Sequence, residues 1–144
     1  MIIFKNKLLC ASVLLLASIL TANILADQSP SAEGASVYII SPGNGDTVSS
    51  PVKVVFGLSG MGVAPAGTQA DNTGHHHLVV DAPLPGLDIP IPSDENYRHF
   101  GKGQTETELE LSSGQHTLQL LLGDWSHIPH GEAVFSEQIT ISVE

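Results

Sequence analysis

Cysteine is almost absent from this 144-residue sequence, and its one occurrence, Cys10, lies in an apolar stretch near the N-terminus. The rest of the chain can therefore form no internal disulfide and can offer no thiolate to a metal ion. Beyond that stretch, Met61 is the only residue that carries sulfur. A metal site in this chain would have to use nitrogen and oxygen ligands, and the fold must be stabilised by packing.

Basic residues are also scarce. After position 26 the chain has only Lys53, Arg98 and Lys102 against fifteen acidic residues, which gives a net charge of −12 when the histidines are neutral. A charge of this size repels nucleic acid and anionic lipid surfaces and attracts cations. We therefore expect no nucleic-acid partner.

The N-terminus has the layout of a secretory signal peptide. Lys5 and Lys7 precede an apolar run over residues 8–22, and small residues follow as far as Ala26. The apolar run is shorter than the roughly 20 residues that span a bilayer. We expect residues 1–26 to be cleaved on export, which predicts a periplasmic or secreted protein without stable membrane insertion.

The remaining sequence has the length of one domain. We expect residues 27–35 to be a disordered lead and residues 36–144 to form a single domain. After the signal peptide no stretch has the sustained 3.6-residue apolar repeat of a helix, whereas alternation with a period of two recurs. The sequence therefore predicts an all-β domain.

The alternation is clearest in two neighbouring segments. In residues 104–111 (QTETELEL) threonines and leucines alternate with glutamates, and residues 115–122 (QHTLQLLL) follow after a turn at Ser113 and Gly114. We expect these segments to form a hairpin. Other strands are expected at 36–40, 52–58, 75–81 and 135–143, with or without a further short strand between residues 82 and 103. About seven short strands predict an immunoglobulin-like antiparallel β-sandwich.

Six of the seven histidines are expected at one end of this sandwich. In the immunoglobulin arrangement the start of strand 75–81, the start of strand 104–111 and the loop after strand 115–122 share an end. That end would carry three groups of histidines: the triplet at 75–77, the single His99, and the pair His127 and His130 in "HIPH". His116 starts its strand at the opposite end, where we expect a structural hydrogen bond to a nearby backbone group.

Neutral imidazoles that converge from several loops are typical ligands of divalent transition metals. Side-chain alternation places His75 and His77 on one face of their strand and His76 on the other. The predicted metal ligands are therefore His75, His77, His127, His130 and, as a fifth candidate, His99, beside glycines that allow close approach. Asp124 could orient one of these imidazoles through a hydrogen bond to the second ring nitrogen, or it could cap its own turn. A cluster of structural histidines that ties loops together is the alternative.

The segments "GHHHLVVD", "HFGKGQTE" and "GQHTLQLLLGDWSHIPH" resemble a family of exported bacterial proteins known as domain of unknown function 4399. The resemblance covers residues 36–143. It implies export and a small β-rich domain but supplies no activity, so the function has to be argued from the residues.

Enzyme motifs are missing from the sequence. The segment "GLSGMG" lacks the Gly-x-Ser-x-Gly spacing of a nucleophile elbow, and "GKGQT" lacks the spacing of a phosphate-binding loop. We therefore predict a non-enzymatic protein that binds Cu(II) or Zn(II) through its histidines, for metal carriage, buffering or sensing. The alternative is a scaffold module that binds a protein of the cell envelope, or a glycan, and whose histidines are structural.

Overall fold

The computed structural model describes residues 28–144, which form nine β-strands and no helix. This part of the chain accordingly has no helix long and apolar enough to cross a membrane. The predicted signal peptide, residues 1–26, lies outside the described residues. The strands are β1 (Ser36–Ser41), β2 (Thr47–Val48), β3 (Val52–Ser59), β4 (Gly62–Val63), β5 (Thr73–Val80), β6 (Tyr97–His99), β7 (Glu106–Leu109), β8 (Gly114–Gly123) and β9 (Ile139–Val143).

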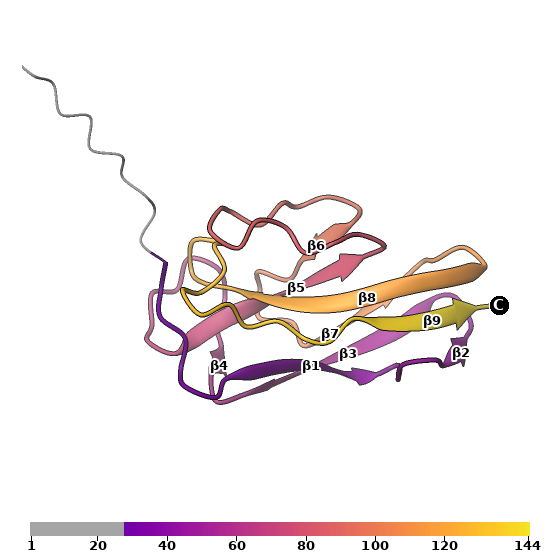
Figure 1. The fold of residues 1–144 in the computed structure, drawn as a ribbon, viewed down its shortest axis with the longest axis horizontal. Coiled ribbons are helices and arrows are strands. Elements are labelled where there is room, and N and C mark those ends of the chain that lie inside the picture. Colours follow the sequence, from indigo (N-terminus) through magenta and orange to yellow (C-terminus); the bar gives the residue numbers. More distant parts are fainter. Residues whose placement is uncertain (1–27) are drawn as a thin grey trace, which may run out of the picture.

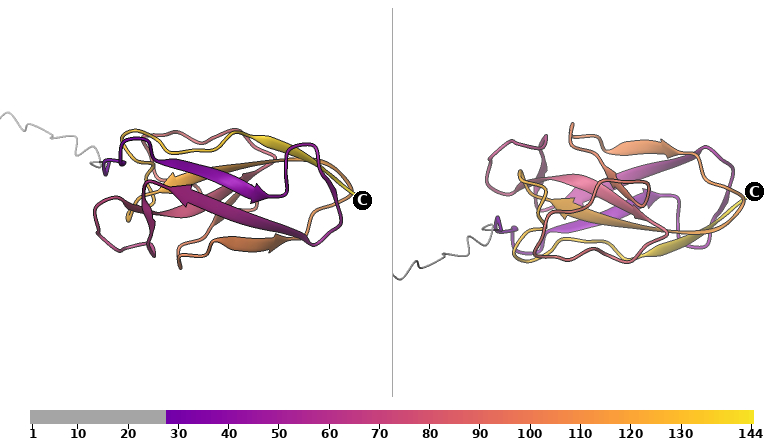
Figure 2. Two further views of the ribbon diagram at one scale, coloured as in Figure 1. Left: turned by 90° about the horizontal axis from the view of Figure 1, so that it is seen from below. Right: turned by 90° about the horizontal axis from the view of Figure 1, so that it is seen from above.

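The strands form two sheets that lie one above the other (Figure 1). The smaller sheet has the order β1-β3-β7, and both of its pairings are antiparallel. The larger sheet has the order β2-β9-β8-β5-β4, and β6 pairs with β5 beside this path. Figure 2 shows the smaller sheet in front when the molecule is seen from below, and the larger sheet with its loops from above. The prediction of an all-β domain is confirmed.

The hydrophobic core fills the space between the sheets. Alternate residues of β3 and β8 point into it, among them Val54, Phe56, Leu118 and Leu120, all of which are buried. Burying a leucine or phenylalanine side chain contributes about 1.5–3 kcal/mol. Because no disulfide can form after Cys10, this burial is the main source of stability.

The predicted hairpin between residues 104–111 and 115–122 is wrong. Both segments are strands, but β7 pairs with β3 in the smaller sheet whereas β8 pairs with β5 and β9 in the larger one. The connection between β7 and β8 therefore crosses from one sheet to the other. The reason is that both segments turn their leucines toward one core, and they reach it from opposite sides.

The predicted disordered lead is also wrong for residues 28–35, while Asp27 lies outside the described residues. Gln28, Ser29 and Ser31 donate side-chain hydrogen bonds to atoms up to 101 positions away in the sequence. The amide of Gly131 donates to the carbonyl oxygen of Ser29 at 3.0 Å. The side chains of Gln28 and Ser31 thus bond to loop backbone, and that of Ser29 bonds to the Asp124 carboxylate.

Candidate metal centre

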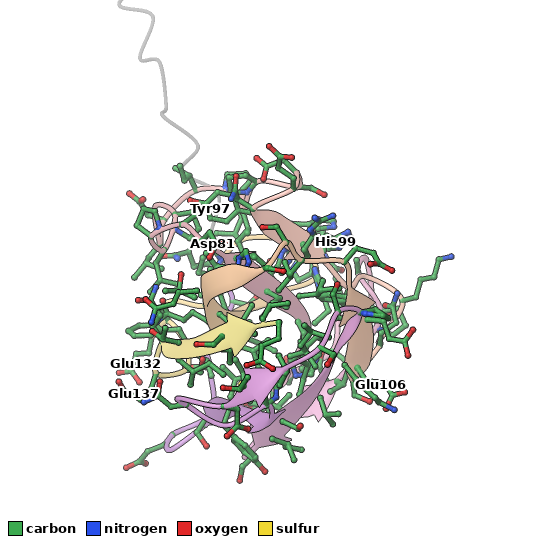
Figure 3. All side chains as sticks on the ribbon, turned by 90° about the vertical axis from the view of Figure 1, so that its right-hand side faces the viewer. Asp81, Tyr97, His99, Glu106, Glu132 and Glu137 are labelled. Atoms are coloured by element: carbon green, nitrogen blue, oxygen red, sulfur yellow. The ribbon has the colours of Figure 1, made fainter. Side chains whose placement is uncertain are left out.

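Strand β5 places His75 and His77 on the outer face of the larger sheet, away from the core. Successive side chains of a strand point to opposite faces, so His76 points inward, where its ring centroid lies 5.2 Å from that of Phe56. His77 pairs across the strands with His99 of β6, and directly paired residues project from the same face. Figure 3 shows His99 on the side of the larger sheet away from β1 and β3.

Four imidazole rings gather on this outer face, and we call them the histidine cluster: His75, His77, His99 and His127. The ring centroids of His75 lie 4.8 Å from His77 and 5.0 Å from both His99 and His127. His99 lies 5.0 Å from His77 and 4.7 Å from His127. The longest separation, 6.3 Å, joins His77 and His127. The predicted convergence of the strand histidines with the "HIPH" loop is confirmed for His127.

Three of these rings already offer nitrogens to one point. One potential ligand atom each from His75, His77 and His99 lies within 4.8 Å of the other two. The Nε2 atoms of His75 and His77 are 3.0 Å apart. Two nitrogen ligands of a tetrahedral zinc ion, each about 2.0–2.1 Å from the metal, lie roughly 3.3 Å apart. A shift of a few tenths of an ångström would therefore let both rings bind one ion.

The polar atoms of the cluster are not all satisfied by the described protein. His75 Nδ1, His77 Nδ1 and His99 Nε2 are buried and have no hydrogen-bond partner among residues 28–144. A buried polar group without a partner costs about 1–3 kcal/mol. In the His75–His77 contact only one Nε2 can donate, since the other must accept. A cation held by both Nε2 atoms would remove their competition for one proton, and the unpartnered His99 Nε2 offers a third nitrogen, so the residues fit a metal ion.

Burial keeps three rings of the cluster neutral. Burial, together with the neighbouring imidazoles of His75, His99 and His127, lowers the pKa of His77 to about 2, because protonated rings would repel one another. Burial, with His127 and His99, lowers the pKa of His75 to about 4. The pKa of His99 is lowered by burial and by His127. At neutral pH these three rings carry free lone pairs, which is the form that binds a metal.

Two glycines make room for the rings. A Cβ atom on Gly123, which pairs with His75, would lie 2.9 Å from His77 Nε2. A Cβ atom on Gly101 would overlap the His99 ring. The sequence suggested the role of Gly101, two residues after His99. It could not suggest that of Gly123, because the relation depends on the register between β5 and β8.

The Gly101→Ala variant is expected to weaken metal binding about 10–100-fold without removing a ligand, because the new methyl group displaces the His99 ring. The fold should tolerate it, since the clash involves the end of a partly exposed side chain. Isothermal titration calorimetry with Zn(II) would measure the effect. Gly131→Ala is the control, because nothing lies within 4 Å of its added Cβ. Equal affinities of the two variants would contradict this account of Gly101.

His127 is held differently from the other three rings. It lies in the loop after β8 with a φ angle of 67°, in the left-handed region that non-glycine residues adopt at some energetic cost. Its amide donates to the Asp124 carbonyl oxygen at 3.0 Å, and its own carbonyl accepts from the Ile91 amide at 2.8 Å. Backbone contacts within its own loop and with the loop between β5 and β6 therefore hold the backbone at His127.

The comparison with protein families gives one match. The model of the family described as Domain of unknown function (DUF4399) matches residues 54–144. The chain belongs to this family. The matched region includes all four histidines of the cluster together with β4–β9 and most of β3. No curated protein and no solved structure matches the chain.

In this DUF4399 domain His130 lies apart from the cluster. Pro129 forms a bridge with Gly123, which faces outward, so the next side chain points inward. There the His130 Nε2 atom donates to the Thr73 carbonyl oxygen at 3.1 Å, and its ring approaches Gly74 on the core side of β5. The prediction that both histidines of "HIPH" point to one site is therefore not met, because they lie on opposite faces of the sheet.

Asp124 caps the loop rather than orienting an imidazole. Its Oδ1 atom accepts from the Ser126 amide at 2.8 Å, from the Ser126 hydroxyl at 2.8 Å and from the Ile128 amide at 3.1 Å. Oδ2 accepts from the Ser29 hydroxyl at 2.8 Å. No described hydrogen bond joins this carboxylate to a histidine, so of the two roles considered for Asp124 the turn-capping role applies.

His116 lies at the other end of β8, as predicted. Its Nδ1 atom is 2.6 Å from Asp81 Oδ2, and its Nε2 donates to the Ser112 carbonyl oxygen at 2.9 Å. The hydrogen bond with Asp81 raises the pKa of His116. Both ring nitrogens are occupied, which makes His116 a suitable control for the cluster.

Proposed function

We propose that this protein binds a divalent transition metal, Cu(II) or Zn(II), through the histidine cluster. The single observation that carries the proposal is the convergence of four imidazoles, three of them with nitrogens within 4.8 Å of one another. His75, His77 and His99 are the principal ligands, and His127 is the fourth. His130 is left out of the ligand set because it lies across the sheet.

The choice of metal follows from the ligand chemistry. Imidazole suits both copper and zinc, and a nitrogen site binds Cu(II) more tightly than Zn(II) in the usual affinity order. The described chain contributes no thiolate, so the soft ligation that Cu(I) favours is absent there. Availability in the compartment decides between the two divalent ions. We propose carriage, buffering or sensing rather than catalysis, because the sequence lacks the spacing of a nucleophile elbow or a phosphate-binding loop.

We further propose that the protein acts after export, in the periplasm or outside the cell. The support is the basic, apolar and small-residue layout of residues 1–26. The strand arrangement also fits an immunoglobulin-like sandwich, with β1-β3-β7 as one sheet and β9-β8-β5 at the centre of the other. Such a fold presents its end loops to the surroundings, and His127 lies in one of them.

Calorimetric titration of the metal-free protein with Cu(II) and with Zn(II) tests the proposal. The His77→Ala variant is expected to lose at least about 100-fold in affinity, and His127→Asn about tenfold, because His127 stands outside the tightest group of three. Asparagine tolerates the left-handed backbone of position 127. His116→Ala removes a histidine from the opposite end and should bind like the wild type. If the wild type binds neither ion more tightly than an unrelated acidic protein does, a scaffold role takes the place of metal binding.

A further inference from the structure

The segment just before β1 joins the two loops that meet at His127. The side-chain amide of Gln28 donates from Nε2 to the Leu87 carbonyl oxygen at 2.7 Å and to the Pro129 carbonyl oxygen at 2.8 Å. Leu87 belongs to the proline-rich loop between β5 and β6, and Pro129 to the loop after β8. One side chain thus connects segments that lie far apart in the sequence.

Ser29 continues this connection toward His127. Its hydroxyl donates to Asp124 Oδ2 at 2.8 Å, and the other oxygen of the same carboxylate holds the amides of Ser126 and Ile128, on either side of His127. A carboxylate that accepts several hydrogen bonds fixes the turn around it. The pKa of Asp124 is lowered by these hydrogen bonds, against the opposing effect of its burial.

The same two loops also meet at His127 itself, where the Ile91 amide donates to the His127 carbonyl oxygen at 2.8 Å. The other three rings of the cluster project from β5 and β6, where strand pairing fixes their backbone. The position of His127 depends instead on contacts between loops. Gln28 and Ser29 make such contacts, and none of their described hydrogen bonds is to a ring of the cluster.

We propose that Gln28 and Ser29 are positioning residues of the metal centre, which hold the fourth ligand, His127, over the three ligands on the strands. The proposal rests on the proposed metal binding. Metal would leave the site by detachment of the His127 loop, and the hydrogen bonds of Gln28 and Ser29 would slow that detachment. The N-terminal segment would then set how long the protein retains its ion.

The test is the rate at which the Zn(II)-loaded protein releases metal to an excess of a chromogenic chelator in stopped flow. Gln28→Met keeps the side-chain length but loses both hydrogen bonds, and Ser29→Ala loses the hydroxyl. We expect each to release zinc roughly 5–10-fold faster, the effect of losing one or two hydrogen bonds. Ser29→Thr should restore the wild-type rate. Ser31→Ala is the control, because its hydroxyl bonds only to the exposed Glu132 carbonyl oxygen.

A second measurement separates positioning from general loosening. In the Cu(II)-loaded protein, electron paramagnetic resonance should report one nitrogen ligand fewer in Gln28→Met and Ser29→Ala, as in His127→Asn. Hydrogen exchange of the metal-free variants should accelerate at the Ile91, His127 and Ile128 amides. Faster exchange with unchanged release and spectra would overturn the proposal while leaving metal binding intact. Failure of the wild type to bind either ion would instead remove the metal centre itself.

Discussion

The metal-free protein is expected to lose most of its stability as the pH falls from about 6.5 to about 4. His75 and His77 are neutral in the folded state down to pH values near 4 and 2, whereas in the unfolded chain they take up protons below about 6.5. The unfolded state therefore binds more protons throughout this range, and acid favours it.

The size of the effect follows from proton linkage. Each such histidine lowers the free energy of unfolding by about 1.4 kcal/mol for every pH unit in the window. Both side chains are almost fully buried, so solvent screens this effect little. Two histidines together approach ~5 kcal/mol, which equals the lower end of a whole domain's stability. His76 and His99, whose pKa values are also lowered, act in the same direction.

His116 acts in the opposite direction, because its pKa is raised in the folded state. Its contribution is present in full below about 6.5 and is lost as the pH rises through the folded value. It therefore cannot account for a loss of stability on acidification. The pKa of the Asp124 carboxyl group is lowered in the folded state. Protonation of Asp124 therefore reduces stability only when the pH falls below the ordinary pKa of 3.8.

Urea unfolding at pH 7, 6, 5 and 4, followed by far-UV circular dichroism, measures this dependence. The His75→Leu/His77→Leu double variant should show a much flatter profile. A wild-type midpoint that stays constant from pH 7 to pH 4 would contradict the lowered pKa values. One consequence concerns binding: His75 and His77 stay unprotonated in the folded protein, so metal affinity should persist to a lower pH than free imidazole would allow.

Saturating metal is expected to raise the melting temperature of the protein by roughly 15 °C. A ligand that binds only the folded state adds about 4 kcal/mol when its free concentration is 1,000 times the dissociation constant. For a domain of this size each kcal/mol shifts the midpoint by about 3–6 °C. Both Cu(II) and Zn(II) should produce the shift, since each can use the same imidazoles.

Differential scanning calorimetry with and without metal measures this shift. His99→Ala should lose most of it, and because His99 is partly exposed at the end of the short strand β6, the variant should still fold. His116→Ala should keep it. A shift of equal size in wild type and His99→Ala would mean that the metal stabilises the fold at some other place.

Much of the site was predictable because strand alternation and topology are local and geometric. Alternation separated His75 and His77 from His76, and the antiparallel relation of β5 and β8 brought the loop after β8 to the start of β5. The resulting contact between His75 and His127, with ring centroids 5.0 Å apart, was the main expectation. His99 belongs to the cluster because β6 pairs with β5. Strand β6 was expected only as a short additional strand.

The errors share one physical cause, which is that a side-chain pattern specifies a face but not a neighbour. The leucines of β7 and β8 point to one core, yet the two strands lie in different sheets. His127 and His130 are three positions apart, and the bridge between Pro129 and Gly123 turns the second ring to the other face. The polar residues Gln28 and Ser29 gave no sign of their partners, which are mostly backbone carbonyl groups and one distant carboxylate.

Strand β7 has a consequence for the behaviour of many copies together. It is an edge strand of the smaller sheet, and its glutamates Glu106 and Glu108 are exposed, with Glu110 exposed just beyond it. If β7 of a second molecule paired antiparallel with this β7, the glutamates of the two strands would repel each other. Lys53 pairs with Glu106 from the neighbouring strand and leaves the other two charges unbalanced. This edge of the smaller sheet is therefore protected against intermolecular sheet growth.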